Sequence, residues 1–502
     1  MSREGLVLGV DASTTACKVL AFDRDGAIVS EGRAPIELAN PSPGAWEQDA
    51  ASWWRALGEA SRSCVRELDP TRLCGLAVAN QRETFVVTDA HGRPLAPALT
   101  WMDHRCAEDV ARAVEVLGAE FLDGATGKPP CTTPSVYKWM GQSRRDPTLA
   151  TRVGMLVDVH GFLVARLTGE ARTSLAAADP MGLVDMPRRR WSDNFLTYLN
   201  LTESKLQGLS EVGGRLGALT VEAAKATGLP AGLPVFAGAG DGQAAGLGAG
   251  ITRPGRAYLN LGTAVVSGVL AHDYRRDRAF RTLFGASPGT YFLETDLQGG
   301  TFTLTWLCEK LLGASLAILP ELEAEARLID AGSDGLFLVP YWNGVMNPYW
   351  DDFASGILVG LRGEHGASHL YRAILEGIAF EQRLHTSGVE ASVGRVEELV
   401  VMGGGASSDL WCQILADVLG KPILRSAIRE ATALGAAMIA AVASGMHETF
   451  EEAARAMTRE GRRFEPGASR SRYDALYRTY RDVYPALRGV LGSRAETSRT
   501  AP

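Results

Sequence analysis

A single carboxylate stands among small residues near the middle of the sequence. Asp241 lies within Gly238–Gly250, where every other residue except one glutamine and one leucine is glycine or alanine. Because glycine has no Cβ, this stretch lets the backbone and a ligand approach each other closely. An isolated acid in such a loop could act on a tightly held substrate. A turn leading into a closely packed Ala/Gly helix is the alternative, and the stretch alone favours that alternative.

Hydroxyl groups and a second carboxylate gather in a turn near the start of the chain. Asp11–Ala16 (DASTTA) separates two apolar segments, Leu6–Val10 and Cys17–Phe22, which we expect to form a hairpin. Such a turn offers hydroxyl and backbone N–H donors to a phosphate, and its carboxylate could hold a metal ion through water. A turn that merely favours small polar residues explains it equally well. The pattern recurs around Gly262-Thr263, which indicates two related halves.

An adjacent cation and anion, Arg82 and Glu83, follow the predicted strand Leu73–Ala79. Ligands of open α/β sheets bind at the carboxyl ends of strands, and this pair could donate to and accept from the hydroxyl groups of a polyhydroxy substrate. Trp101, at the end of another predicted strand, could provide an apolar face for a carbon chain. Composition alone favours the simpler alternative, a surface ion pair and a core tryptophan.

Glycines also precede two predicted helices in the second half. Gly403–Ala406 (GGGA) follows the predicted strand Glu398–Met402, and Ser407 or Ser408 could cap the next helix. Gln298–Thr301 (QGGT) precedes another helix. A glycine turn at a helix N-terminus admits a flat or charged ligand close to the backbone. The spacing is neither that of the G-x-G-x-x-G dinucleotide fingerprint nor that of a P-loop, and a tight turn is the alternative.

The composition limits the class of protein. A chain of 502 residues should hold two to four domains, and its net charge of −7 argues against a nucleic-acid partner. The seven cysteines are scattered, which fits reduced thiols in a cytoplasmic enzyme better than a disulfide framework or a zinc site. No apolar run approaches the ~20 residues that a membrane span needs. We therefore expect a soluble, cytoplasmic protein.

Taken together, these motifs resemble the FGGY family of carbohydrate kinases over residues 5–485. The most specific match is Gly356–Leu361 (GILVGL), followed after seven residues by His369–Glu376 (HLYRAILE), which fits the second family signature. The first signature is imperfect, since Val136 stands where a lysine is common.

Three further segments match the family in order. Asp11–Lys18 is similar to the first phosphate motif, although Ser13 stands where glycine is usual. Gly262-Thr263 is similar to the second phosphate motif, and Gly403–Ala406 is similar to the adenosine motif. Because the matches follow one another along the chain, coincidence is implausible and the functional interpretations are preferred.

The resemblance implies an α/β fold of two actin-like (ribonuclease H-like) domains with an interdomain cleft, as in the sugar kinase, Hsp70 and actin superfamily. The expected domains are residues 1–252, which would bind the substrate, and residues 253–490, which would bind ATP. Residues 491–502 are expected to form a disordered tail.

The resemblance also implies roles for single residues. Asp241 falls on the family's catalytic aspartate and would accept the proton of the attacking hydroxyl. Arg82, Glu83 and Trp101, together with Asp241, would bind the substrate. Asp11 and Asp241 would hold Mg²⁺, directly or through water. ATP would be bound by residues of both halves: Asp11, Thr14, Thr15, Gly262, Thr263, Gly300, Gly404, Gly405 and Ser408.

Different segments resemble family members that act on different substrates. Asn80–Thr84 (NQRET) and Trp101 are similar to glycerol kinases, whereas Cys131 stands where those enzymes have a tyrosine. Asp11–Thr15 (DASTT) and the segment Gly403–Asp417 are similar to xylulose kinases. The terminal hydroxyl of a ketopentose such as xylulose is our first choice, and that of glycerol or another polyol is the runner-up.

Two other classes of protein stay open. An actin- or Hsp70-like ATPase that acts on a protein partner would need neither the substrate residues nor the base at Asp241. A catalytically silent sugar sensor is disfavoured by the presence of Asp11 and Asp241. The expected partner is thus a small sugar or polyol, with neither a nucleic acid nor a membrane, and the chain could form a homodimer.

Overall fold

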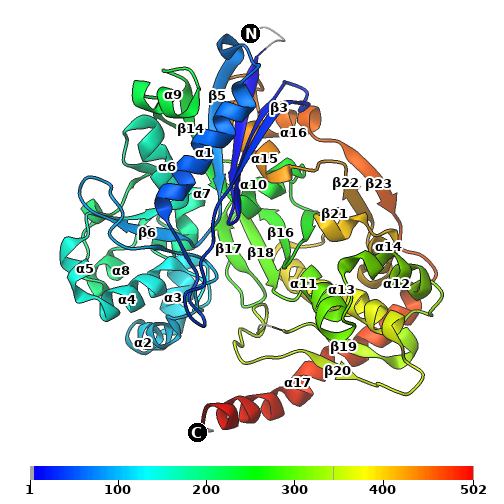
Figure 1. Ribbon diagram of the computed structural model, residues 1–502. Helices are drawn as coiled ribbons and strands as arrows, with labels where there is room; N and C mark the ends of the chain where they lie inside the picture. Colours follow the sequence, from blue (N-terminus) through cyan, green and yellow to red (C-terminus); the bar gives the residue numbers. More distant parts are fainter. Residues whose placement is uncertain (1–4, 343, 501–502) are drawn as a thin grey trace.

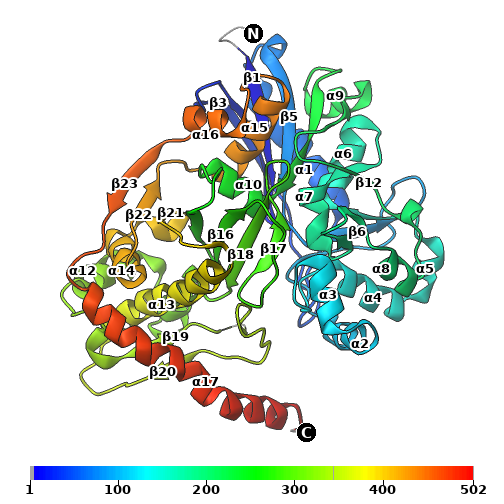
Figure 2. The same ribbon diagram turned by 180° about the vertical axis from the view of Figure 1, so that it is seen from behind.

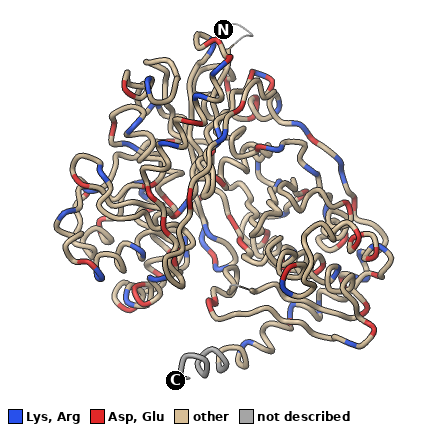
Figure 3. Tube along the Cα trace, in the orientation of Figure 1, with Lys and Arg blue, Asp and Glu red and all other residues tan. Residues whose placement is uncertain are grey.

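The computed structural model describes residues 5–342 and 344–500, and for residues 493–500 it describes the backbone only. Two α/β lobes lie side by side, and the chain completes most of one before it enters the other (Figure 1). Lys and Arg positions are interspersed with Asp and Glu positions over both lobes (Figure 3). Each lobe is organised around one large sheet.

The first lobe contains a six-stranded sheet. In spatial order its strands are β13 (Arg215–Ala218), β14 (Pro234–Gly240), β5 (Leu73–Asn80), β1 (Leu6–Ala12), β2 (Ala16–Phe22) and β3 (Ile28–Pro35). β1 runs antiparallel to β2 and parallel to β5, which runs parallel to β14. β1 and β5 are almost wholly buried, which explains their continuous apolar sequences. The predicted hairpin around Asp11–Ala16 is confirmed.

The second lobe repeats this arrangement in a seven-stranded sheet. In spatial order its strands are β17 (Arg281–Phe284), β18 (Tyr291–Leu297), β16 (Val265–Ala271), β15 (Arg256–Leu261), β21 (Glu398–Met402), β22 (Ile423–Ser426) and β23 (Glu460–Phe464). β15 runs antiparallel to β16 and parallel to β21. The series β18-β16-β15-β21-β22 therefore matches β3-β2-β1-β5-β14 in order and direction. The predicted relation between the two halves is confirmed at the level of topology.

Helices flank both sheets. The principal ones are α1 (Ala50–Val65), α6 (Val159–Thr168), α10 (Asp241–Gly248), α13 (Ala367–Val393), α14 (Asp409–Leu419), α15 (Ala431–Ala443) and α17 (Arg470–Thr500). α1 and α6 meet over the first sheet, where Trp53 and Phe162 pack edge to face with ring centroids 5.4 Å apart. α13 and α14 pack together in the second lobe, and α17 contacts both of them before it extends away from the lobes (Figures 1 and 2).

Shorter elements complete the lobes and carry part of the site. A four-stranded sheet in the first lobe consists of β4 (Glu47–Gln48), β7 (Ala98–Leu99), β6 (Phe85–Thr88) and β8 (Met155–Asp158). Near it lie α2 (Ala107–Leu117), α3 (Ala119–Thr126), α4 (Ser135–Arg145) and α5 (Pro147–Arg152). Residues 172–215 contain several short elements: β9 (Arg172–Ser174), α7 (Leu175–Ala178), β10 (Val184–Asp185), β11 (Arg190–Trp191), α8 (Asp193–Tyr198) and β12 (Gly208–Ser210). The remaining elements are α9 (Val221–Thr227), α11 (Thr301–Trp306), α12 (Leu319–Ala326), β19 (Phe337–Val339), β20 (Ile357–Val359) and α16 (Phe450–Met457).

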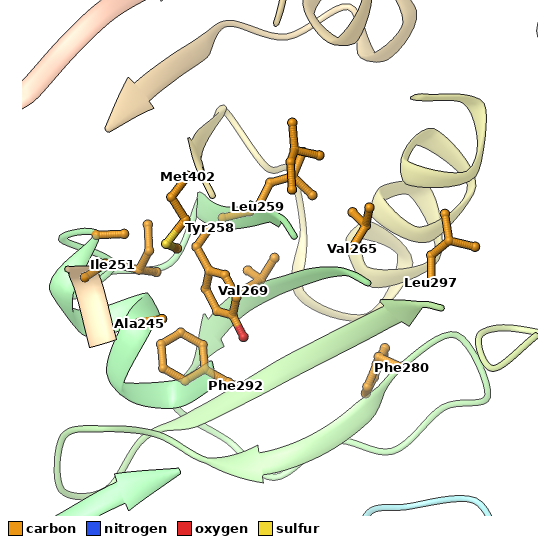
Figure 4. Close-up of a cluster of buried hydrophobic side chains, with 14 of the residues drawn as sticks. Ala245, Ile251, Tyr258, Leu259, Val265, Val269, Phe280, Phe292, Leu297 and Met402 are labelled. Carbon is orange, nitrogen blue, oxygen red and sulfur yellow. The ribbon is translucent and has the colours of Figure 1, made fainter. Parts of the chain in front are cut away.

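Two helices connect the lobes by close packing. α15, from the second half of the chain, packs across β1, β5 and β14 of the first sheet. α10, from the first half, lies against Tyr258 and Phe292 of the second sheet, and a Cβ at Gly246 would come within 2.8 Å of the Tyr258 ring (Figure 4). The two helices also touch, since a Cβ at Gly435 would lie 1.9 Å from the Ala244 carbonyl oxygen. The small residues after Asp241 thus serve helix packing, as the alternative interpretation of this stretch expected.

The structure differs from the sequence predictions at the C-terminal end. α17 continues to Thr500, so residues 491–500 are helical where a disordered tail was predicted, and residues 501–502 lie outside the described residues. Residue 343 also lies outside them. Within the described part of the chain, no single helix is long and apolar enough to cross a membrane. In that part, only the helices at 301–311 and 316–326, taken together, reach that length and apolar composition, and they are bent by 108° relative to each other. The domain limits at residues 252/253 and 490 stay predictions.

Candidate active site

The predicted base lies where β14 meets α10. β14 ends at Gly240, and Asp241 is the first residue of α10. The Asp241 side chain is 37% exposed, and its Oδ1 atom lies 3.0 Å from Arg82 Nε and accepts a hydrogen bond from the Gly242 N–H at 2.8 Å. Burial of its surroundings raises the pKa of Asp241, and the Arg82 guanidinium opposes that rise. A solvent-accessible carboxylate is thereby fixed beside a cation.

The second predicted acid shares this edge of the sheet. Asp11 pairs in register with Ala79 of β5, and Asn80 pairs with Gly240 of β14, so the strands bring Asp11 and Asp241 to one edge. Asp11 is 7% exposed, and its Oδ1 atom has no hydrogen-bond partner in the described part of the chain. Burial, reinforced by the nearby Asp241 carboxylate, raises the pKa of Asp11 to about 7. An unsatisfied buried oxygen of this kind fits a ligand site.

Arg82 and Glu83 face the other lobe and are not a surface pair. Arg82 Nη1 donates to both carboxylate oxygens of Glu294 at 2.9 Å, and Arg281 Nη1 donates to Glu83 Oε1 at 3.0 Å. Glu294 belongs to β18 and Arg281 to β17, so both partners come from the second lobe. Arg82 and Glu83 are 8% and 6% exposed. The predicted substrate residues are therefore held by a buried network that joins the lobes.

The backbone at Glu83 is held in an uncommon conformation. Its φ of 55° places it in the left-handed region, which non-glycine residues rarely adopt. The Lys138 ammonium donates to the Glu83 carbonyl oxygen at 3.2 Å and also to the Thr133 carbonyl oxygen. Lys138 is fully buried, and burial lowers its pKa. Contacts to both the carbonyl and the carboxylate thus stabilise the orientation of Glu83.

Trp101 connects the substrate motif to the first phosphate motif. Its indole Nε1 donates to the Thr14 hydroxyl at 3.0 Å, and its backbone N–H donates to the Thr84 hydroxyl at 3.2 Å. The side chain is not part of the core, because Trp101 is 37% exposed. Thr15, the next residue of the hairpin turn, is exposed. A substrate lying on Trp101 would therefore adjoin the turn expected to hold phosphate.

The structure brings three of the predicted nucleotide residues together in the second lobe. Gly262 and Thr263 form the turn between β15 and β16, and their carbonyl oxygens accept from the N–H groups of Thr301 at 2.8 Å and Phe302 at 3.3 Å. Gly300 packs directly on this turn, since a Cβ there would lie 2.6 Å from the Gly262 carbonyl oxygen. The bare backbone at Gly300 is thus required by the turn itself.

Of the three glycines after β21, only Gly404 lies beside open space. Gly403 has a φ of 86°, and a Cβ placed at Gly404 would meet no atom within 4 Å. Gly404 is exposed, whereas Gly405 packs against the Trp411 ring. Ser408 caps α14, because its hydroxyl oxygen accepts from the Trp411 N–H at 3.0 Å. The cap is observed, and the nucleotide roles of Gly404, Gly405 and Ser408 stay predictions.

The donor set suits a cation that brings its own ligands. Among the described residues, no group of three or more His, Cys, Asp or Glu side chains could hold a metal ion. Mg²⁺ commonly takes one or two protein carboxylates and completes its shell with water and substrate phosphates. Asp11, with its unsatisfied buried oxygen, and the accessible Asp241 fit that requirement.

Sequence reasoning missed the partners from the second lobe. Arg281 and Glu294 lie some 200 residues from Arg82 and Glu83 in sequence, and no local motif relates them. A signal was present, because charged residues rarely stand in fully buried strands unless they are paired. Such residues are Arg281 in β17 (RTLF) and Glu294 in β18 (YFLETDL).

The duplicated sheets and the site at the edge of both lobes define an actin-like ATPase fold. The structure is similar to the xylulose kinase from Rhodospirillum rubrum, with a TM-score of 0.90 and 28% identity over 97% of this chain and 100% of that chain. Its fold is also that of Plasmodium falciparum glycerol kinase with ADP, with a TM-score of 0.87 and 21% identity over 96% of this chain and 98% of that chain.

Sequence comparison gives the family. The N-terminal domain of the FGGY family of carbohydrate kinases matches residues 6–248, and the C-terminal domain matches residues 257–444. The xylulose kinase of Escherichia coli (strain K12) is 28% identical over 486 residues, 96% of this chain and 99% of that protein. The glycerol kinase of Thermococcus gammatolerans is 30% identical over 498 residues, 97% and 98% of the two chains. The chain belongs to the FGGY family of carbohydrate kinases and is an ATP-dependent phosphotransferase with an alcohol acceptor.

Proposed function

We propose that the protein phosphorylates the terminal hydroxyl of a small linear sugar, with a ketopentose such as xylulose as the first candidate. The observation that carries the proposal is the position of Asp241, accessible to solvent, beside Arg82 and on the same sheet edge as Asp11. The similarity to xylulose kinases at 28% identity over nearly the whole chain supports the ketopentose.

The residues divide the reaction between them. Asp241 accepts the proton of the attacking hydroxyl. The oxygen of that hydroxyl bonds to the γ-phosphorus, and the bond between the γ-phosphorus and the β–γ bridging oxygen breaks. Arg82, Glu83 and Trp101 orient the sugar. The turns at Thr14-Thr15 and Gly262-Thr263 offer hydrogen-bond donors to the phosphates. The backbone near Gly404, Gly405 and Ser408 contacts the nucleoside.

Asp11 and Asp241 would hold Mg²⁺, directly or through water, and the ion would supply positive charge to offset that of the ATP phosphates. The protein contributes the Asp11 oxygen, which is buried and without another partner among the described residues. Closure of the two lobes around the substrates would exclude water, so that transfer goes to the sugar and ATP is not hydrolysed.

Glycerol is the second candidate, and two observations favour it. Arg82, Glu83 and Trp101 resemble the glycerol-binding residues of glycerol kinases, and the glycerol kinase of Thermococcus gammatolerans is 30% identical to the chain. ADP release measured over a panel of polyols, ketopentoses and ketohexoses separates the two. We expect the greatest stimulation by a ketopentose. Stimulation confined to glycerol would make glycerol the substrate, and no stimulation by any compound would contradict the proposed reaction.

A further inference from the structure

Four charged side chains form an alternating series across the lobe boundary. Arg281 lies 3.0 Å from Glu83 through Nη1 and 2.6 Å from Glu294 Oε1 through Nη2. Glu294 in turn accepts from Arg82 at 2.9 Å. All four are less than a tenth exposed, and Glu294 is fully buried. The order Glu83–Arg281–Glu294–Arg82 therefore gives every charge an opposite partner, and Arg82 extends the series to Asp241 at 3.0 Å.

Neighbouring groups fix Glu294 within this series. The Tyr258 hydroxyl donates to Glu294 Oε2 at 2.7 Å. Gly242 leaves room for the contact, because a Cβ there would lie 2.9 Å from Glu294 Oε2 and 3.0 Å from the Arg82 guanidinium. Burial alone would raise the pKa of Glu294, but Arg82 and Arg281 lower it to about 2. The carboxylate is therefore charged at neutral pH and holds Arg82 in one orientation.

We propose that Glu294 and Arg281 are positioning residues for the sugar site, and that they hold Arg82 and Glu83 in the orientation that binds the substrate. The inference rests on the proposed function, in which Arg82 and Glu83 bind the sugar. Side chains that are already ordered lose less conformational entropy when a ligand binds. Because the positioning pair comes from the second lobe, the sugar site of the first lobe is complete only when both lobes are in place.

The left-handed backbone of Glu83 supports this role. Strained conformations of this kind persist where surrounding contacts maintain them, and they cluster at functional sites. Here Arg281 holds the carboxylate of Glu83 and Lys138 holds its carbonyl oxygen. Without Arg281, the side chain would lose the contact that fixes its direction.

The test uses Glu294→Gln and Arg281→Lys in the full-length chain. We expect Glu294→Gln to raise the KM for the sugar by about 30-fold or more, because the Arg82 charge loses its buried partner. Arg281→Lys keeps the charge but cannot bridge Glu83 and Glu294 with a planar fork, so a smaller rise in the same direction is expected. The KM for ATP and the affinity for ADP should stay as in the unaltered protein.

A matched control breaks a different contact between the lobes. Arg276 and Glu120 also pair across the boundary, at 3.3 Å, but their side chains are 44% and 88% exposed. Such a pair contributes little, and Glu120→Gln should leave both KM values unchanged. Thermal unfolding shows whether each variant is folded. If Glu294→Gln does not fold, the KM of Arg281→Lys for the sugar decides the question.

Two results would overturn the inference. One is an unchanged KM for the sugar in folded variants. The other is a parallel rise in the KM for ATP, which would mean that the four side chains support the packing of the lobes in general. Failure of the proposed function looks different, because the unaltered protein would then phosphorylate no member of the sugar and polyol panel.

Discussion

The two sheets share one topology but carry different chemistry at corresponding edges. In the first lobe Asp11 is the penultimate residue of β1, just before the last pair of the hairpin, and in the second lobe Asn260 occupies that place on β15. The next parallel strand leads to Arg82 and Glu83 in the first lobe and to the glycines from Gly403 in the second. Charged side chains can accept a proton and bind the hydroxyl groups of a polyhydroxy substrate. A glycine backbone without side chains leaves room for a nucleotide. Under the proposed function, two sheet edges of the same topology would therefore hold different ligands.

Replacing Asp11 by Asn would remove the charge that distinguishes the first edge from the second. We expect kcat to fall by about 10²-fold or more, because the charge that would hold Mg²⁺ on the phosphates is lost. Stability should stay equal or rise, since the change removes an unpaired buried carboxylate. Steady-state kinetics at varied Mg²⁺ and thermal unfolding measure the two effects. Unchanged kcat would show that Asp11 and Asn260 are equivalent after all.

A buried acid of the second lobe sharpens the contrast with Asp11. Glu381 accepts hydrogen bonds from the hydroxyls of Tyr341 and Tyr480, each at 2.8 Å, and burial raises its pKa to about 7 from 4.5. Since the folded pKa is the higher one, the protonated form favours the folded state. Its contribution is fully present below pH 4.5 and is lost as the pH rises through 7.

Glu381→Gln should remove this pH dependence, which amounts to on the order of 3 kcal/mol in the free energy of unfolding. Denaturant unfolding of the unaltered and substituted proteins at pH 4.5 and at pH 7.5 measures the difference between their slopes. Catalysis should be unaffected, because neither Glu381 nor the two tyrosines that donate to it belong to the proposed site. Equal slopes in the two proteins would contradict a structural role for the Glu381 carboxyl.

Gly404→Val tests the second edge alone. A side chain there meets no protein atom within 4 Å and Gly404 is exposed, so folding should be unaffected. We expect the KM for ATP to rise by about 10-fold or more as the valine fills space that the nucleotide needs, while the KM for the sugar stays unchanged. Gly363→Val, at another glycine with open space around it, is the control. A change in the KM for the sugar alone would reverse the assignment of the two edges.

Sequence reasoning succeeded where the signal was local. The turns at Asp11–Ala16 and Gly262-Thr263 and the cap at Ser408 each lie within a few residues of the pattern that predicted them. The family resemblance was confirmed as well.

What the sequence could not give depends on contacts between distant segments. The pairing of Glu294 with Arg82 spans 212 residues, and nothing near either residue indicates the other. The glycines around Asp241 were interpreted as room for a ligand, whereas several of them are needed because α15, Tyr258 and Glu294 approach α10 closely. Periodicity shows that a helix has an apolar face but not which sheet that face covers, and α15 covers the sheet of the other lobe.

The most direct test of the division between the two edges is a single-turnover measurement on Asp241→Asn with saturating ATP. The carboxylate that takes the proton is lost, so we predict that sugar phosphorylation slows by ~10²–10⁴-fold. The amount of bound nucleotide should match that of the unaltered protein, because the substitution leaves the proposed contacts to the nucleoside at Gly404, Gly405 and Ser408 in place. Phosphoryl transfer at the original rate would show that Asp241 is not the base.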